Sequence, residues 1–287
     1  MTDINLEEAL GNSCQATVKS SKRITSDNTD EIRELHLSID EPAFRCMAGQ
    51  NIGVLVPGPH PFGNEFHHRY YTIAGMHTED AENVEIEILV RRCFYIDEVS
   101  GESYPGISSN YLCDAIPGEQ ITITGPYKAA FRVPADKGSN LLMIGTGTGI
   151  APFRTLVKSI YDQHGDWQGK VRLFYGAKSG LDTLYMNDQN SDLTNYYDEA
   201  TFKAYSAINP RPRMDASVAL GNSLAENSAE TWALMQEPNT YVYLAGLKKQ
   251  VAVLDKVMSK VAGSEAAWQA LRKQLAREGR WAELTFQ

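Results

Sequence analysis

Long apolar runs are missing from the 287-residue sequence. A membrane-spanning helix needs about 18 consecutive apolar residues, and no segment approaches that length. The N-terminal stretch MTDINLEEAL is acidic and lacks the basic and apolar regions of a signal or transit peptide. We therefore expect no membrane span and a cytoplasmic location.

Cysteine is scarce, and its four positions are far apart. Cys14, Cys46, Cys93 and Cys113 are separated by 32, 47 and 20 residues. This spacing includes neither the paired cysteines of a zinc site nor the close run of an iron–sulfur cluster. The adjacent histidines His67 and His68 also lack the spacing of metal ligands. We expect no metal site in the chain, so any metal cluster that takes part in its reaction belongs to a partner protein.

Basic residues are too few for nucleic-acid binding. The chain has 27 Lys and Arg against 36 Asp and Glu, a formal net charge of −9, whereas binding to a phosphate backbone requires a basic face. The deficit lies in residues 1–137, with 11 basic and 21 acidic residues, while the remainder holds 16 and 15. This asymmetry and the chain length indicate two globular domains with different ligands.

Short strand-like segments separated by glycine and proline dominate the first half. They are residues 51–56, 69–73, 84–90 and 120–124. Short strands at this spacing are typical of an antiparallel barrel or sandwich. Residues 133–140, VPADKGSN, look like a linker, so we place the domain boundary between residues 136 and 137.

The second half alternates strand-like and helical segments. Apolar runs recur at 141–144, 171–175 and 241–244, and helical patterns cover 151–164 and 265–277. In the last of these, Trp268, Leu271 and Leu275 form one apolar stripe. Such alternation predicts a parallel sheet covered on both faces.

The most specific local motif is GTGTGIAPFR, residues 145–154, between an apolar strand and a helix. Glycines let a backbone turn approach a phosphate, and the following helix start offers unpaired N–H groups. The spacing is not a strict GxGxxG, so a plain glycine-rich turn is the alternative.

Two further motifs lie in the first half. In RYYT, residues 69–72, strand alternation puts Arg69 and Tyr71 on one face, where a guanidinium could pair with a phosphate beside a stacking ring. The alternative is an ordinary surface strand. In GISSN, residues 106–110, hydroxyl and backbone N–H groups precede an apolar pair, which also suits a helix N-cap.

In this order the motifs resemble the plant-type ferredoxin–NADP reductase family. The resemblance runs from about Gly49 to Phe286 and includes VRRCFY, PGEQITITGP, LFYGAKS, VYLAGLK and RKQLAREGRW. It implies an antiparallel β-barrel FAD-binding domain, residues 1–136, followed by a Rossmann-like α/β NAD(P)-binding domain, residues 137–287. The implied activity is hydride transfer between NAD(P)H and FAD, coupled to one-electron exchange with ferredoxin or flavodoxin.

The resemblance also implies roles at matching positions for FAD. Arg69 matches the arginine on the diphosphate, Tyr71 the ring packed on the isoalloxazine, and Thr72 the catalytic hydroxyl beside the flavin, normally a serine. Tyr95 matches the ring on the adenine, and Ser109 a phosphate-binding serine. The remaining residues predicted on this side are Tyr70, Arg91, Gly106, Ser108 and Lys128, with Arg91 at a position where a lysine contacts the pyridine dinucleotide.

For the pyridine dinucleotide, the resemblance implies that the binding residues lie in the glycine loop and at the end of the sheet. The predicted residues are Gly145, Thr146, Gly147, Thr148, Gly149, Pro152, Gly176, Asn209, Arg211, Arg213, Gly246, Leu247 and Phe286. Phe286 stands at the family's C-terminal aromatic position, which shields the flavin. The acidic residue that assists the reaction aligns with Leu284, so the neighbouring Glu283 is the candidate.

The choice between NADP and NAD depends on a 2′-phosphate site. The family's Ser-Arg pair aligns with Ile208 and Asn209, and its tyrosine aligns with Asp215, which would repel a phosphate. Arg211 and Arg213 could rebuild the site or be surface residues. We predict relaxed or NADH-leaning selectivity.

An acidic ferredoxin would dock on basic side chains. The candidates are Lys128, Arg132, Arg154, Lys248, Lys249 and Arg272. Two alternative functions are the reductase component of a multi-component oxygenase, and a non-catalytic flavin- or nucleotide-binding module that uses the same folds.

Overall fold

The computed structural model describes residues 13–41, 43–60, 64–80, 83–97, 99–187, 192–208 and 215–286. The chain divides into two compact units, Met1–Ala129 (unit 1) and Ala130–Gln287 (unit 2). The boundary thus lies a few residues before the one placed from sequence. Phe131 explains the offset, because its ring stacks on Phe153 and Tyr243 of unit 2, with centroid distances of 5.6 and 4.8 Å.

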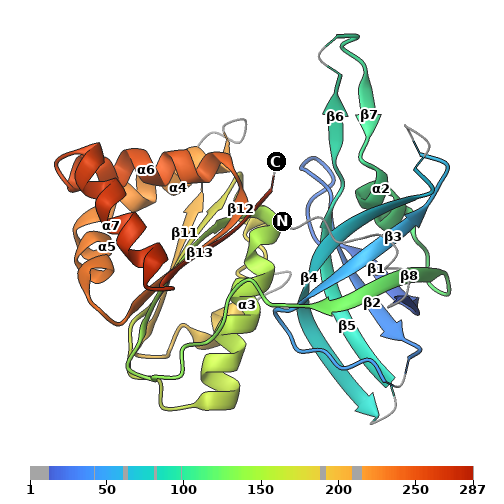
Figure 1. The fold of residues 1–287 in the computed structure, drawn as a ribbon, viewed down its shortest axis with the longest axis horizontal. Coiled ribbons are helices and arrows are strands. Elements are labelled where there is room, and N and C mark those ends of the chain that lie inside the picture. The colour runs from blue at the N-terminus through green and yellow to red at the C-terminus, as the bar shows by residue number, and fades with distance from the viewer. Residues whose placement is uncertain are drawn as a thin grey trace. The chain divides into compact units, whose positions relative to one another are not determined.

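Unit 1 is a closed barrel of antiparallel strands in the order β1-β2-β5-β4-β3-β8 (Figure 1). The strands are β1 Ser13–Arg23, β2 Ile32–Ile39, β3 Asn51–Pro57, β4 Phe66–Asp80, β5 Asn83–Arg91 and β8 Gln120–Tyr127. A short hairpin of β6 Phe94–Ile96 and β7 Ser103–Pro105 leads into helix α2, Ile107–Asp114. Pairing of β1 with β8 closes the barrel.

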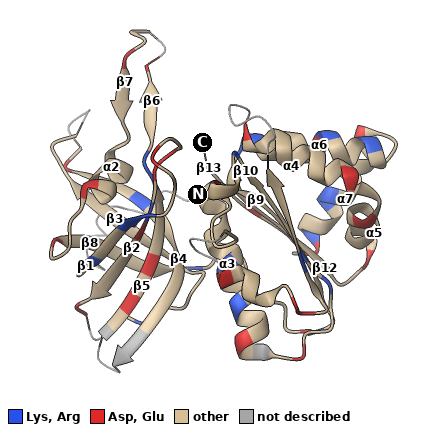
Figure 2. Ribbon diagram, turned by 180° about the vertical axis from the view of Figure 1, so that it is seen from behind, with Lys and Arg blue, Asp and Glu red and all other residues tan. Residues whose placement is uncertain are grey.

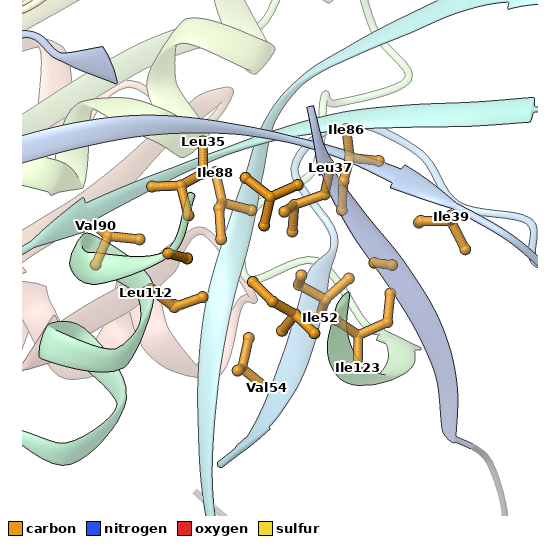
Figure 3. Packing of buried hydrophobic residues seen from close by; sticks show 14 of the residues in the cluster. Leu35, Leu37, Ile39, Ile52, Val54, Ile86, Ile88, Val90, Leu112 and Ile123 are labelled. Carbon is orange, nitrogen blue, oxygen red and sulfur yellow. The ribbon is translucent and has the colours of Figure 1, made fainter. Parts of the chain in front are cut away.

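Alternation along the strands builds the barrel core. On β5, Ile86, Ile88 and Val90 are buried with at most 1% exposure and point into the same core as Leu112 of α2 (Figure 3). The intervening side chains therefore face outward. Burying each such side chain contributes about 1.5–3 kcal/mol, which holds α2 against the barrel wall.

Unit 2 is a parallel sheet with the strand order β11-β10-β9-β12-β13. The strands are β9 Asn140–Thr146, β10 Val171–Ala177, β11 Phe202–Ile208, β12 Thr240–Leu247 and β13 Trp281–Phe286. The α-helices are α3 Ile150–Lys158, α4 Ala216–Glu226, α5 Ser228–Gln236, α6 Lys249–Val261 and α7 Glu265–Arg277. Helix α3 covers one face of the sheet, and α4, α5, α6 and α7 cover the other (Figure 1).

The structure confirms a barrel followed by a Rossmann-like parallel sheet. The helix expected at 151–164 is α3 continued by a π-helical segment, Ser159–His164. The strand-like runs picked out in the sequence all fall within strands, whereas β1, β2, β11 and β13 carry no such apolar run. Within the described part of the chain, no helix has the length and apolar character to cross a bilayer.

Candidate functional site

In unit 1, the RYYT motif lies on β4 beside β3, with Thr72 paired to Asn51. The Thr72 hydroxyl donates to Asn51 Oδ1 at 2.9 Å, and Asn51 Nδ2 donates to the carbonyl oxygen of Lys128 at 3.1 Å. These bonds tie β4, β3 and the segment after β8 together. The hydroxyl is thereby held in one orientation, and the predicted residues Thr72 and Lys128 are brought together.

Arg69 and Tyr71 share one face of β4, as strand alternation predicts. Tyr71 packs against the barrel core, and burial raises the pKa of its phenol, while the Arg69 charge and the Ser108 hydroxyl act in the opposite direction. Arg69 is exposed, and no carboxylate pairs with it among the residues the structure describes. A neutral aromatic ring and an available guanidinium therefore lie side by side, which suits a planar cofactor that carries phosphate.

Tyr70 lies in a ring cluster, and its predicted contact with FAD stays a prediction. Its ring meets Tyr127 edge-on at 4.9 Å and His68 at 4.8 Å. His68 Nε2 lies 2.9 Å from the Thr124 hydroxyl, and burial lowers the pKa of His68. These contacts account for Tyr70 and His68 as parts of the barrel wall.

The GISSN segment forms the start of α2. Gly106 is the N-cap, and no side chain caps the first turn. The Ser109 hydroxyl accepts from Cys93 N at 3.2 Å and donates to the Gly106 carbonyl at 3.3 Å, while Ser108 is buried. A helix begins here, as the N-cap interpretation predicts, and its first turn has no side-chain cap. Anion binding by its free N–H groups stays a prediction.

Arg92 is a residue that the sequence analysis missed. Its guanidinium donates to Glu31 at 2.7 Å, to Asn110 at 2.9 Å and to Asp114 at 2.7 Å. Burial raises the pKa of Glu31, but hydrogen bonds from Arg92 and Arg33 outweigh it and hold that pKa below its usual value. Arg92 thus fastens α2 to the barrel, and only the structure distinguishes it from its neighbour in VRRCFY.

Arg91 and Tyr95 lie on the more exposed side of this region. Arg91 Nη1 is 3.8 Å from an Asp30 carboxylate oxygen. Tyr95 is 55% exposed, and its ring stacks on Tyr104 with centroids 5.5 Å apart and planes at 22°. An exposed pair of stacked rings offers a flat surface to a purine base.

In unit 2, the glycine loop follows β9 and leads into α3. A Cβ on Gly149 would lie 2.2 Å from the Ala245 carbonyl oxygen, so only glycine allows this approach of the loop to β12. Gly147 has φ +56° and open space where a Cβ would point. Helix α3 has no side-chain cap. The loop is a cradle of backbone N–H groups with an open side, which fits a dinucleotide diphosphate.

Other predicted residues around this loop have packing roles. A Cβ on Gly145 would meet the Phe153 ring at 2.7 Å, and one on Gly176 would meet the Ala216 carbonyl at 2.6 Å. Pro152 is the third residue of α3, where an N–H would have no partner within the helix. Thr146 Oγ1 donates to Gln250 Oε1 at 3.2 Å, while Thr148 remains half-buried in the loop.

The carboxyl edge of the sheet gathers the remaining residues. Strand order reverses between β9 and β12, the place where α/β sheets bind ligands. Leu247 pairs with Phe286, and Gly246 with Thr285, so the ends of β12 and β13 lie at the same edge as the glycine loop. The Glu283 carboxylate is hydrogen-bonded within unit 2: it accepts from Arg272 at 2.6 Å and from Trp281 Nε1 at 2.7 Å.

Half of the predicted docking residues are engaged within unit 2. Arg154 is 7% exposed and pairs with Asp192 at 2.6 Å, so its assignment to a docking patch is wrong. Arg272 pairs with Asp255 and Glu283, and Lys249 pairs with Asp215. The exposed candidates without an ion pair to another described residue are Lys128, Arg132 and Lys248.

The predicted residues Asn209, Arg211 and Arg213 lie outside the described residues. On one side of that segment, Ile208 ends β11 with 46% exposure. On the other side, Asp215 is the N-cap of α4, and its Oδ1 accepts from Ser217 N at 2.9 Å.

Comparison with known proteins identifies the relatives of the chain. A family model described as the oxidoreductase NAD-binding domain matches residues 143–256. The chain is 30% identical over 276 residues to a ferredoxin–NADP reductase from Spirulina sp, covering 94% of this chain and 93% of that protein. It is 32% identical to the Synechocystis enzyme of the same name, covering 88% of this chain and 62% of the relative.

The fold is likewise similar to a solved structure. Ferredoxin-NADP+ reductase from Plasmodium falciparum matches with a TM-score of 0.68 at 18% identity, covering 96% of this chain and 97% of that one. Identity of 30% over nearly the full length of a relative is sufficient to assign the family. The chain belongs to the plant-type ferredoxin–NADP reductase family.

Proposed function

We propose that the protein is an FAD-dependent ferredoxin–NAD(P)+ reductase, which moves hydride between NAD(P)H and FAD and exchanges single electrons with ferredoxin or flavodoxin. FAD supplies the conversion of a two-electron step into one-electron steps, which no side chain can perform. The observation that carries the proposal is the placement of exposed Arg69 and partly buried Tyr71 on one strand face, in a chain whose relatives are named for this reaction.

In unit 1 the residues bind and orient the flavin nucleotide. Arg69 and the uncapped first turn of α2 neutralise the diphosphate. The Tyr71 ring, whose pKa burial raises further above neutral pH, gives the isoalloxazine an uncharged, apolar surface. The Thr72 hydroxyl donates its hydrogen bond to Asn51 Oδ1. The lone pairs of Thr72 Oγ1 can therefore accept a hydrogen bond from the cofactor.

In unit 2 the backbone of Gly147–Gly149 and the start of α3 bind the dinucleotide diphosphate. Phe286, at the end of β13 beside Leu247, offers a ring without a hydroxyl group. It can stack and exclude water, and it cannot move a proton. Hydride transfer requires the nicotinamide and the flavin in contact and shielded from water.

For the dinucleotide we propose relaxed or NADH-leaning selectivity. Asp215 presents a carboxylate at the start of α4, and Lys249 compensates part of its charge. Ile208, exposed at the end of β11, offers no hydrogen bond to a phosphate. The test is the ratio of kcat/KM for NADPH to that for NADH. A preference for NADPH above about 100-fold, equal to about 2.7 kcal/mol, contradicts this proposal.

For the partner we propose an acidic ferredoxin, or flavodoxin, and we propose a cytoplasmic location. The candidate docking residues are Lys128 in unit 1 and, separately, Arg132 and Lys248 in unit 2. The experiment is NADH- or NADPH-dependent reduction of ferredoxin by the FAD-loaded protein at increasing salt. Turnover should fall steeply as salt screens the charges. A protein that holds FAD and oxidises NAD(P)H but does not reduce ferredoxin contradicts the proposed partner and favours a dedicated acceptor.

A further inference from the structure

Two histidines and a glutamate meet on the wall of the unit 1 barrel, on three neighbouring strands. His36 lies on β2, Glu87 on β5 and His77 on β4, and their candidate ligand atoms all lie within 4.8 Å of one another. Glu87 Oε1 is 3.7 Å from His36 Nε2 and also contacts His77 Nε2. One carboxylate oxygen is therefore shared between two imidazole nitrogens.

The strand register explains how residues so far apart in sequence converge. His36 is the direct partner of Glu87 between β2 and β5. Gly75 is the partner of Glu87 on β4, and because it has no side chain, the His77 ring two residues further along can reach Glu87. The two imidazole rings stack with centroids 5.5 Å apart and planes at 12°.

The cluster lies on the outer face of the barrel but is not simply solvated. Leu35, Leu37, Ile86 and Ile88 point into the core, so His36 and Glu87 between them point outward. Glu87 is nevertheless only 3% exposed, whereas the His77 side chain is 50% exposed. The carboxylate is thus buried under an imidazole that solvent can reach, and a buried carboxylate needs a compensating positive charge.

The surroundings of the cluster are acidic. Glu34 Oε1 lies 3.4 Å from His36 Nε2, and Glu85 is two residues from Glu87 on the same face of β5. Figure 2 shows acidic residues in red along β5. The local charge favours a cation over an anion.

We propose that His36, His77 and Glu87 bind one divalent transition-metal ion of the zinc class. Imidazole nitrogen and carboxylate oxygen bind Zn²⁺ at about 2.0–2.2 Å, so ligand atoms around a tetrahedral ion are roughly 3.4 Å apart. To reach that size, the His36–Glu87 distance shortens, the His77–Glu87 contact lengthens, and the stacked imidazole rings turn so that both Nε2 atoms face the ion. Two imidazoles select zinc, nickel or copper over magnesium or calcium, and three protein ligands leave one position for water.

The ion would tie β2, β4 and β5 together and stabilise unit 1 by mass action. Zinc has no redox chemistry, so hydride and electron transfer do not depend on it. This proposal replaces the expectation of no metal site. That expectation considered only local spacing, whereas His36, His77 and Glu87 are isolated positions that pair across strands.

The test is calorimetric titration of the full chain with zinc chloride, with thermal unfolding as the second readout. We expect one site with a Kd in the micromolar range and a rise in Tm on zinc addition. His77→Gln removes a ligand without changing the formal charge. Because the His77 side chain is half-exposed, we expect the variant to fold. It should weaken binding at least 10-fold, and Glu87→Gln should do the same.

Two matched controls separate ligation from diffuse charge. Glu85→Gln removes a negative charge from the same strand without removing a ligand, and His60→Gln makes the same substitution at a histidine whose Nε2 bonds to the Val56 carbonyl. Both should change Kd less than 3-fold. The proposal is overturned if zinc gives no binding heat, if His77→Gln binds as tightly as the wild type, or if Glu85→Gln weakens binding as much as His77→Gln.

Discussion

The two units prepare their cofactor sites by different means. In unit 1 the groups are side chains on β4: the Thr72 hydroxyl is held by Asn51, Tyr71 packs against the barrel core, and Arg69 is exposed. In unit 2 they are backbone groups: Gly147 leaves open space where a Cβ would point, and Gly149 lets the loop approach Ala245 of β12. Substitution of a side chain in the unit 1 site should weaken cofactor binding and leave the unit folded. Substitution of a glycine at a close backbone contact in unit 2 should reduce both stability and cofactor binding.

The largest expected effect is that of Gly149→Ala in unit 2. Its Cβ would lie 2.2 Å from a backbone oxygen, so β12 and the loop must separate, at a cost of roughly 3 kcal/mol. Thermal unfolding should show this loss together with a large rise in KM for NAD(P)H. Gly147→Ala is the control, since its Cβ points into open space and costs only about 1–2 kcal/mol for the left-handed backbone. Equal stability of the two variants would contradict the packing argument.

The next effect is that of Arg92→Ala in unit 1. The substitution leaves the Glu31 and Asp114 carboxylates without this partner and releases α2, which should destabilise unit 1 by about 2 kcal/mol. FAD content should fall, because the Ser108 and Ser109 segment loses its support. Arg91→Ala removes a neighbouring arginine that lies 3.8 Å from Asp30 and should change stability by less than about 0.5 kcal/mol. The midpoints of urea unfolding of Arg92→Ala and Arg91→Ala measure the two changes in stability.

Arg69→Gln tests the side-chain character of unit 1. Arg69 is exposed, so the free energy of unfolding of the apoprotein should change by less than about 0.5 kcal/mol. The Kd for FAD should rise about 10-fold or more, because a charged hydrogen bond to phosphate contributes about 1.5–3 kcal/mol. Fluorescence titration with FAD measures the change, and an unaltered Kd would remove Arg69 from the site.

The smallest effect is on pH dependence. The pKa of Glu31 is lower in the folded chain than its usual value, so folding is favoured when Glu31 is ionised. This stabilisation is complete above the unfolded pKa of about 4.3 and disappears as pH falls through the lower folded pKa. Urea unfolding of Glu31→Gln should therefore show lower stability than wild type at pH 7 and a difference that shrinks below pH 4. A difference independent of pH would contradict the linkage.

In unit 2, the pKa of Glu230 is lowered in the same way as that of Glu31 in unit 1. Burial raises the pKa of Glu230, but Arg172 and Tyr205 outweigh it and lower that pKa. Arg172 donates at 2.8 Å and the Tyr205 hydroxyl at 2.9 Å. Both units thus use a carboxylate to join a helix or loop to a strand, and acid should weaken both.

Much of the fold followed from the sequence because its apolar runs coincide with strands on the barrel or sheet core. Residues 84–90 and 141–144 are examples, where burial requires the pattern that is visible in the letters. β1 and β2 were not expected because neither has a continuous apolar run. Their inward residues, such as Ala16 and Val18 on β1 or Leu35 and Leu37 on β2, alternate with polar ones. β13 was not expected because Glu283 and Thr285 interrupt its apolar residues, so the segment WAELTF contains no apolar run.

The candidate sites divide in the same way. The glycine loop and RYYT could be predicted because neighbouring residues carry the chemistry. Pairings across strands could not, which is why Arg92 was missed beside Arg91, and why His36, His77 and Glu87 were not grouped. The burial of Arg154 also depends on Asp192, a residue 38 positions away.

The most direct test of the account is anaerobic stopped-flow mixing of the FAD-loaded protein with NADH and, separately, with NADPH, while the flavin absorbance is followed. We expect the flavin to bleach rapidly with at least NADH and to recover its colour when oxidised ferredoxin is added. A protein that binds no FAD, or a bound flavin that neither nucleotide reduces, would contradict the account.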